Sequence, residues 1–379
     1  MIRGGNHLSS RLRWLLLLTA ILAASVVVLV ATSPRTEAQD QGNPPTARAS
    51  ASGNVSSGDI SVAERANARD YWTPERMRKA KALDMTVPGP PSAPESDAVP
   101  KPEGRAVKVP PAAPGGNSAS GASSSVVQPA ATTSEGYTYP YPFTRYEVFD
   151  PGVTNYTAYP YRTNGKVFFT KATGGDFVCS GTVVNADNRS TVWTAGHCVS
   201  DGEGRFHRNW VFVPAYRNNV RPFGTWTARE LQTRGEWHFF GNFEQDVAAA
   251  IVNPLSGVRL QNRVGAQGIS FNQPYPQHWH SFGYPQDPPF DGNRLYACVA
   301  SYARQDNPNP RPGPLAIGIG CDMTGGASGG GWIQGFKGSG GFVNSVNSYK
   351  YFSPSQPLAM YGPYHGTEAL NLYNFVRTR

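Results

Sequence analysis

The sequence has few of the features that mark metal enzymes or nucleic-acid-binding proteins. It contains four cysteines but no C-x-x-C or H-E-x-x-H spacing, so a zinc site has little support. The formal net charge is +8, yet after residue 136 the basic residues are scattered singly, without a helix-spaced run or a basic–aromatic patch. We therefore expect no metal, no organic cofactor and no nucleic-acid partner.

Composition changes sharply along the 379 residues. Residues 39–135 are rich in Pro, Ala, Ser and Gly, whereas the aromatic residues are concentrated after Gly136. A segment of the first kind buries too little apolar surface to fold alone. The sequence therefore predicts a folded domain at 136–379, preceded at 39–135 by a disordered, low-complexity prosegment or linker.

One part of that segment, Tyr71–Leu83, has helix signals. Thr73 can cap a helix, and Pro74 suits its first turn. Its apolar face would consist of Met77, Ala80 and Leu83. Such a short stripe is too small to be stable alone. Two interpretations stay open: a transient helix in a linker, or a prosegment element that docks on the mature domain.

Residues 1–38 have the layout of an export signal. Basic residues precede an apolar run, Trp14–Val30, and Thr36 and Ala38 place small residues where a signal peptidase cleaves. We predict a secreted protein with no stable membrane association once the signal is removed. Without cleavage, the apolar run would act as a membrane anchor.

The four cysteines, Cys179, Cys198, Cys298 and Cys321, all lie in the predicted domain. An even number in an exported chain favours disulfides over metal ligation. From spacing alone, three connectivities remain open.

Short β-rich runs separated by Gly, Pro and Asn turns follow Gly136. Many short strands in an exported domain indicate an all-β antiparallel architecture, either a barrel pair or a sandwich. A C-terminal helix is expected at Glu368–Val376, capped by Thr367, with Leu370, Tyr373 and either Phe375 or Val376 on its apolar face. The strands are expected at Lys166–Thr170, Phe177–Val184, Thr191–Ala195, Trp210–Val213, Val247–Val252, Trp279–Phe282, Leu295–Ser301 and Gly341–Val346.

Two segments contain residues suited to nucleophilic catalysis. Thr191–Cys198 (TVWTAGHC) ends a strand at His197, and Asp322–Trp332 (DMTGGASGGGW) surrounds Ser328 with glycines. A serine nucleophile needs a base, a group that orients the base, and donors for the oxyanion. The N–H groups of Gly326 and Ser328 are the natural donors. Taken singly, each segment is more often a flexible loop or a structural histidine; their combination favours catalysis.

These motifs resemble those of the chymotrypsin-like serine peptidases. TAGHC at Thr194–Cys198 is similar to the histidine motif of that family, and GGASGG at Gly325–Gly330 is similar to its G-x-S-G-G nucleophile motif. The run Cys321–Gly329 resembles the C-D-x-T-G-G-x-S-G run of the bacterial glutamyl-endopeptidase-like branch. The resemblance covers roughly Tyr159 to Arg379.

The resemblance implies two packed six-stranded antiparallel β-barrels with the catalytic site between them. His197 and an acid would come from the first barrel and Ser328 from the second. It also implies a disulfide between Cys179 and Cys198, which would bracket the histidine loop. A bond between Cys298 and Cys321 would then tie a second-barrel strand to the loop before the nucleophile.

In this family's chain order the acid lies between His197 and Ser328. The candidates are Asp201, Asp246, Asp287, Asp291 and Asp306. Asp246 is preferred because it stands directly before the apolar run VAAAIV, where a buried carboxylate can accept the imidazole N–H. Its neighbour Glu244 is expected on the surface.

The sequence departs from the trypsin pattern beside the nucleophile. Trypsin-like zymogens bind a newly formed N-terminal amine with an aspartate that is Ala327 here. Inhibition by residues 39–135 would therefore act by covering the cleft or by restraining the mature N-terminus.

The substrate pocket is expected to involve Asp322, Met323, Asn347 and Ser348. Asn347 replaces the histidine of glutamyl endopeptidases, so a strong preference for glutamate is not expected. Asp322 has two interpretations: a partner for substrate Arg or Lys, or a structural residue of the motif.

The function predicted from the sequence is that of a secreted serine endopeptidase, acting as a monomer on protein or peptide substrates. One alternative is an esterase that uses the same triad. The other is an inactive peptidase-fold binding module, although such modules usually lose one of the three catalytic residues.

Overall fold

The computed structural model of the chain describes residues 46–49, 54–89, 91, 99–115, 135–138, 140–149, 155–309, 311, 313–352 and 358–379. The expected export signal, residues 1–38, lies outside these residues. No helix in the described part of the chain has the length and apolar character needed to cross a membrane.

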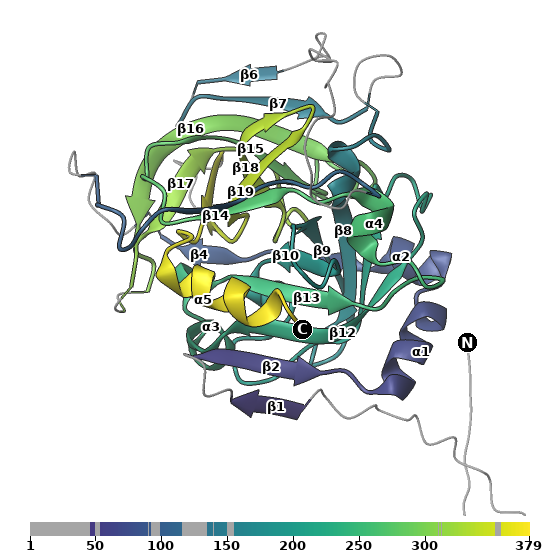
Figure 1. The fold of residues 1–379 in the computed structure, drawn as a ribbon. Helices are drawn as coiled ribbons and strands as arrows, with labels where there is room; N and C mark the ends of the chain where they lie inside the picture. Colours follow the sequence, from purple (N-terminus) through teal and green to yellow (C-terminus); the bar gives the residue numbers. More distant parts are fainter. Residues whose placement is uncertain are drawn as a thin grey trace, which may run out of the picture. The chain divides into compact units, whose positions relative to one another are not determined.

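Six antiparallel strands close into a barrel (Figure 1). Around the barrel the order is β12, β11, β8, β9, β10 and β13, and β13 pairs back with β12. All residues of β8 and β13 are buried, which fits the apolar runs that predicted these strands. The strands are β8 (Asn164–Thr170), β9 (Asp176–Val183), β10 (Thr191–Thr194), β11 (Arg208–Pro214), β12 (Trp226–Arg234) and β13 (Ala248–Val252).

A ten-stranded sheet forms the other half of the fold. Its main path runs β21, β17, β16, β15, β18, β19, β14 and β5, and β7 pairs with both β16 and β6. Its strands are β5 (Val107–Val109), β6 (Glu135–Tyr137), β7 (Phe143–Glu147), β14 (Gly268–Phe271), β15 (His278–Gly283), β16 (Tyr296–Asp306), β17 (Ala316–Gly320), β18 (Gly331–Lys337), β19 (Gly340–Val346) and β21 (Ala359–Gly362).

The expected all-β class, with a closed six-stranded antiparallel barrel and a C-terminal helix, is confirmed. The second half differs from a six-stranded barrel, because its strand ladder does not close among the described residues and takes in β5, β6 and β7 as additional strands. All eight predicted strands form, with ends shifted by a few residues.

The C-terminal helix α5 (Thr367–Val376) packs on β12, β13 and β14. Its N-cap is Gly366 rather than the expected Thr367, which lies inside the first turn. Two residues of the expected apolar face, Tyr373 and Val376, are buried, whereas Leu370 is only partly buried. The buried residues are Ala369, Leu372, Tyr373 and Val376.

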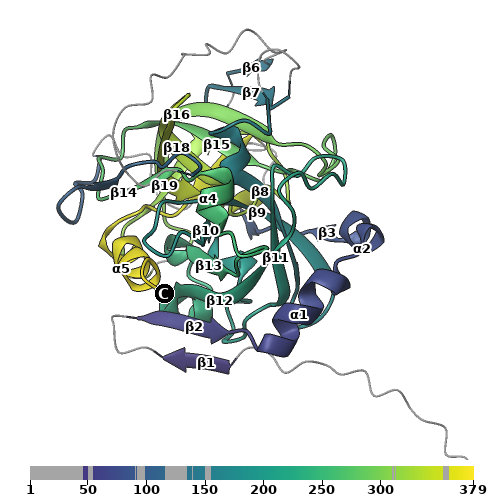
Figure 2. The same ribbon diagram turned by 45° about the vertical axis from the view of Figure 1, so that its right-hand side comes forward.

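The amino-terminal segment is ordered in places where composition predicted little fixed structure. Strand β2 extends the barrel sheet at β12, and helix α1 packs on β11 and β12 (Figure 2). Trp72 anchors the segment: it is 1% exposed, contacts Phe168 at 5.5 Å between ring centroids, and donates from Nε1 to the carbonyl of Asn209. The elements are β1 (Thr46–Ala49), β2 (Val55–Asp59), α1 (Val62–Tyr71), α2 (Pro74–Lys79), β3 (Lys81–Ala82) and β4 (Thr86–Pro88).

Helix α2 begins as predicted, with the Thr73 hydroxyl accepting from the backbone N–H of Arg76 at 3.2 Å. It ends at Lys79, four residues before the predicted end at Leu83, because Lys81 and Ala82 pair with β9 as β3. The three apolar residues of its predicted face are buried against the barrel: Met77, Ala80 and Leu83. Between the two interpretations of this segment, the structure therefore favours docking.

Two disulfides join Cys179 to Cys198 and Cys298 to Cys321, the pairing implied by the family resemblance. The first links β9 to the turn after β10. The second links β16 to the segment that leads to Ser328, closing a loop with a sequence separation of 23.

Replacing Cys298 and Cys321 together by alanine removes this second crosslink. The free energy of unfolding should fall by about 3 kcal/mol, because a covalent loop of this size limits the entropy of the unfolded chain. Urea unfolding of the variant and the unaltered protein, both without reductant, measures the difference. Equal midpoints with equal slopes would contradict the expectation.

Candidate active site

His197 lies at the centre of a short 3₁₀ turn, Gly196–Cys198, that directly follows β10. The disulfide at Cys198 fixes one end of this turn to β9. Gly196 allows close packing, since a Cβ there would lie 2.5 Å from Trp237 Cγ and 2.9 Å from Asp246 Oδ1. His197 is consequently held in one place, with 2% of its surface exposed.

Asp246 is fully buried between the 3₁₀ turn Phe243–Gln245 and β13. Its Oδ2 lies 2.7 Å from His197 Nδ1, and its Oδ1 accepts from the backbone N–H of His197 at 2.8 Å. The hydroxyl of Ser348 also donates to Oδ2. A carboxylate with these contacts accepts the Nδ1 proton, which leaves Nε2 of His197 as the basic nitrogen.

Among the described residues, none of the other four candidate acids has a hydrogen bond to His197. Asp201 binds Arg205 and the backbone of its own loop, and Asp306 accepts from the hydroxyls of Tyr349 and Tyr351, each at 2.7 Å. Of the five candidates, Asp246 is the one that the fold brings to the imidazole.

Ser328 lies in the glycine-rich loop before β18 and is 7% exposed. Gly326 has φ +94°, and a Cβ there would lie 2.7 Å from the carbonyl oxygen of Tyr284. A side chain would therefore be both strained and in collision at this position. Among the described residues, the N–H groups of Gly326 and Ser328 have no acceptor. Both are free to donate to an oxyanion.

Ser180 in β9 orients this loop and carried no recognisable signal in the sequence. Its hydroxyl donates to the carbonyl of Gly326 at 2.9 Å, and its N–H donates to the carbonyl of Ser328 at 2.7 Å. These contacts fix the two carbonyl groups toward the barrel.

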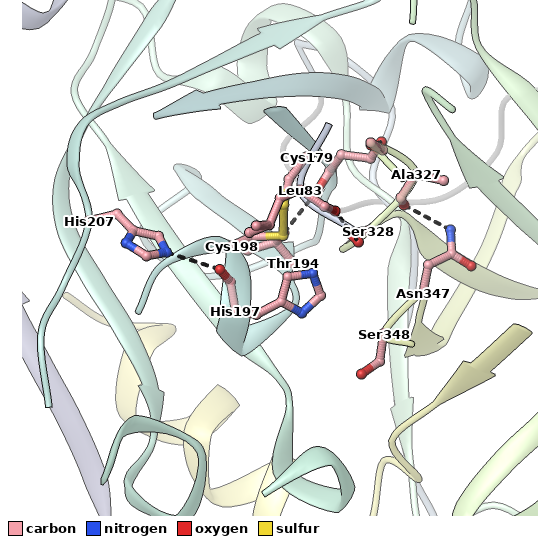
Figure 3. The surroundings of a disulfide bond; sticks show 12 residues. Leu83, Cys179, Thr194, His197, Cys198, His207, Ala327, Ser328, Asn347 and Ser348 are labelled. Atoms are coloured by element: carbon pink, nitrogen blue, oxygen red, sulfur yellow. Dashed lines mark hydrogen bonds between the residues drawn. A yellow bond between two sulfur atoms is a disulfide. The ribbon is translucent and has the colours of Figure 1, made fainter. Parts of the chain in front are cut away.

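His207 supports the histidine turn from behind (Figure 3). Its Nδ1 accepts from the N–H of Ala172 at 3.3 Å, so its Nε2 donates to the carbonyl of His197, 3.0 Å away. The ring stacks on Phe169 with centroids 4.7 Å apart. Burial lowers the pKa of His207 to about 3, which keeps it neutral.

The backbone of the amino-terminal segment reaches the nucleophile (Figure 3). The hydroxyl of Ser328 donates to the carbonyl oxygen of Leu83 at 3.3 Å. Nε2 of His197 is buried and has no hydrogen-bond partner among the described residues. In this arrangement the serine hydroxyl is bonded to the segment rather than to the imidazole.

Asn347, one of the predicted pocket residues, has its amide fully engaged. Its Oδ1 accepts from Ser281 and Trp332, and its Nδ2 donates to the carbonyl groups of Phe282 and Ala327. No donor or acceptor of this side chain is left for a substrate. Met323, a second predicted pocket residue, is completely buried.

Asp322 forms an ion pair with Arg145 of β7. Burial raises the pKa of Asp322, although Arg145 and Lys350 act in the opposite direction. Since its charge is already matched inside the protein, the geometry favours the structural interpretation of Asp322 over recognition of substrate Arg or Lys.

Lys350, two residues after Ser348, was missed by sequence reasoning. Its ammonium group donates to the carbonyls of Cys321 and Met323 at 3.3 and 3.1 Å. Burial lowers the pKa of Lys350 to about 8. An isolated lysine after a strand of mixed residues gives no sequence signal of this burial.

A carboxylate–imidazole pair beside a serine with two available N–H donors is the arrangement of a serine hydrolase. No protein-family model matches the chain, and neither does any curated protein. Solved structures do match. The thermostable serine protease AL20 from an extremophilic microorganism is 44% identical, with 57% of this chain and 97% of that chain covered and a TM-score of 0.52.

Protease Anisep from Arthrobacter nicotinovorans is 42% identical, with 57% of this chain and 96% of that chain covered and a TM-score of 0.52. A Glu endopeptidase in complex with MPD is 17% identical, with 62% and 97% covered and a TM-score of 0.46. The chain belongs to the chymotrypsin-like serine peptidase family.

Glu244 is buried, not on the surface as expected. It is 2% exposed, its Oε1 accepts from the N–H of Asn309 at 3.3 Å, and its Oε2 has no hydrogen-bond partner in the described part of the chain. The expectation was wrong because the 3₁₀ turn before Asp246 directs this side chain inward, toward the 306–309 loop. Burial raises the pKa of Glu244 from 4.5 to about 7.

A raised pKa means that the folded state binds the Glu244 proton more tightly than the unfolded state does. The associated stability is fully present below pH 4.5 and is lost as the pH rises through about 7. Glu244→Gln should therefore lose less thermal stability than the unaltered protein between pH 5 and pH 8. Glu203→Gln, at an exposed position, is the matched control. Parallel melting curves for all three proteins would contradict the expectation.

Proposed function

We propose that the chain is a secreted serine endopeptidase that hydrolyses peptide bonds through Ser328, His197 and Asp246. The observation that carries the proposal is the double contact of Asp246 with His197, made in a fold shared with serine proteases at 44% identity. The serine protease relatives imply peptide or protein substrates.

In the proposed mechanism, His197 Nε2 takes the proton from the Ser328 hydroxyl as the serine oxygen attacks the peptide carbonyl carbon. The N–H groups of Gly326 and Ser328 stabilise the oxyanion. The protonated imidazole then gives its proton to the leaving amine, and water hydrolyses the acyl-enzyme by the same steps. Asp246 holds the ring in the required tautomer and stabilises its cationic form.

Export is part of the proposal. Residues 1–38 would be the signal, residues 39–135 a prosegment and residues 136–379 the peptidase domain. Two disulfides fit an extracellular protein, because such bonds persist in oxidising compartments.

The proposal is tested with a fluorophosphonate probe on the processed form recovered from culture medium. Ser328→Ala should abolish labelling and lower turnover of a peptide library by about a million-fold, because the nucleophile is lost. Ser301→Ala, which changes an exposed serine on β16, is the matched control and should keep both activities.

Mass spectrometry of the labelled protein should identify Ser328 as the modified residue. A processed form that takes up no probe would refute the enzyme proposal and favour the binding-module alternative. Turnover of esters without turnover of any peptide would favour the esterase alternative.

A further inference from the structure

Residues 80–88 run across the nucleophile and pair with the main chain on both sides of it. Before Leu83, strand β3 pairs in parallel with β9, and the N–H of Leu83 donates to the carbonyl of Val178 at 3.3 Å. After Leu83, strand β4 pairs in parallel with β20 (Lys350–Phe352), and the N–H of Lys350 donates to the carbonyl of Met85 at 3.0 Å. β9 carries Cys179 and Ser180, and β20 follows Ser348, so the segment occupies edges that adjoin the active site.

Side-chain contacts hold the same segment in place. Ala80 and Leu83 are 1% and 7% exposed, and both belong to the barrel's hydrophobic core cluster. Nε2 of Gln286 donates to the carbonyl of Ala80 at 2.7 Å, while its backbone N–H donates to the carbonyl of Gly325 at 2.8 Å. Gln286 thus links the segment directly to the loop that carries the oxyanion donors.

The segment is anchored well away from the nucleophile as well. Strand β2 adds to the edge of β12, helix α1 covers β11 and β12, and Met77 of α2 is 2% exposed. These contacts make residues 80–88 the end of a docked unit rather than a loose strand. Docking of this kind keeps their local concentration at the active site high.

Leu83 is placed to block the serine but not to be cleaved by it. Acylation needs the carbonyl carbon at the serine oxygen and the carbonyl oxygen at the two N–H donors. Here the carbonyl oxygen of Leu83 instead accepts from the Ser328 hydroxyl, and the donors of Gly326 and Ser328 have no acceptor among the described residues. While this hydrogen bond holds, the hydroxyl proton is engaged by Leu83 and not by Nε2 of His197, which has no hydrogen-bond partner among the described residues, so the proton transfer that starts the reaction is disfavoured.

We infer that residues 80–88 are a built-in inhibitor that fills the active site in a non-productive alignment and is not cut there. The inference rests on the proposed function and concerns its regulation. With Ala327 beside the nucleophile, residues 39–135 were expected to inhibit either by covering the cleft or by restraining the mature N-terminus. The inference selects the first of these, covering of the cleft. Because β2, α1 and α2 bind the barrel independently of the connection to residue 136, one chain cut would not release the segment. Activation requires its removal.

The test compares the rate of fluorophosphonate labelling of the full chain with that of Leu83→Pro. Proline removes the N–H that binds Val178 and cannot continue the β3 pairing. Labelling of the variant at Ser328 should be about tenfold faster or more, because the open site becomes more populated. Val62→Pro is the matched control: Val62 is 76% exposed at the first position of α1, where proline is tolerated, and its labelling should equal that of the unaltered chain.

Ala80→Asp provides a second variant if Leu83→Pro does not give a cooperative thermal transition. It places a charge in a buried contact of the segment and should accelerate labelling in the same way. The processed form serves as the reference for an uncovered site. If the unaltered full chain labels as fast as the processed form, the inhibitor inference is wrong and the proposed peptidase stands. If neither the processed form nor any full-length variant labels, the proposed function itself fails.

Discussion

The carboxylate of Asp246 is the point on which the geometry of the proposed active site depends. It binds the main chain and the ring of His197 from the barrel, and it receives the hydroxyl of Ser348 from the chain that follows β19. A buried carboxylate is stable only when donors satisfy it, so these partners are mutually required. One side chain therefore fixes the tautomer of the imidazole and also joins the barrel to the second sheet.

Ser180 makes the reciprocal connection. It belongs to the barrel but binds the carbonyl groups of Gly326 and Ser328, which belong to the loop before β18. Its neighbour Cys179 is bonded to Cys198, beside His197. The barrel thus positions both His197 and the loop that carries Ser328, and a displacement of β9 would disturb both. The site therefore needs both the barrel and the loop before β18, because contacts between them hold its residues in place.

Local sequence patterns were enough to predict several strands and the candidate site residues. Apolar runs such as that of β13 predicted strands, and the histidine motif and the apolar run after Asp246 singled out two residues that the fold brings into contact, His197 and Asp246. Several strands, β12, β17 and β18 among them, were missed. β12 (WTARELQTR) lacks a regular alternation of apolar and polar residues and contains an irregular register, and β17 and β18 are interrupted by glycines. These strands are stabilised by their neighbours, which a single run of residues does not reveal.

The roles of Glu244, Lys350 and Ser180 were beyond sequence reasoning for a related reason. Each depends on which backbone groups a distant segment presents: the 306–309 loop for Glu244, the carbonyls before the nucleophile for Lys350, and the glycine loop for Ser180. Hydrogen bonds to main-chain groups leave little trace in residue type. Patterns of apolar residues predict which faces are buried, but not which backbone groups meet.

The same limit explains why composition failed at residues 54–88. β2, β3 and β4 pair through their backbones with strand edges, and almost any residue can make such hydrogen bonds. The side chains that add affinity are few and widely spaced, chiefly Trp72, Met77 and Leu83. A segment rich in Pro, Ala, Ser and Gly cannot fold by itself, yet it can fold on a barrel that supplies both the edges and the apolar surface.

Such a segment can occupy an active site without containing a sequence that the enzyme would recognise as substrate, because its position is set by pairing on either side of the nucleophile. The β3–β9 pairing ends just before Leu83, and the β4–β20 pairing begins a few residues after it. These two pairings, and not the leucine side chain, place the carbonyl of Leu83 at Ser328.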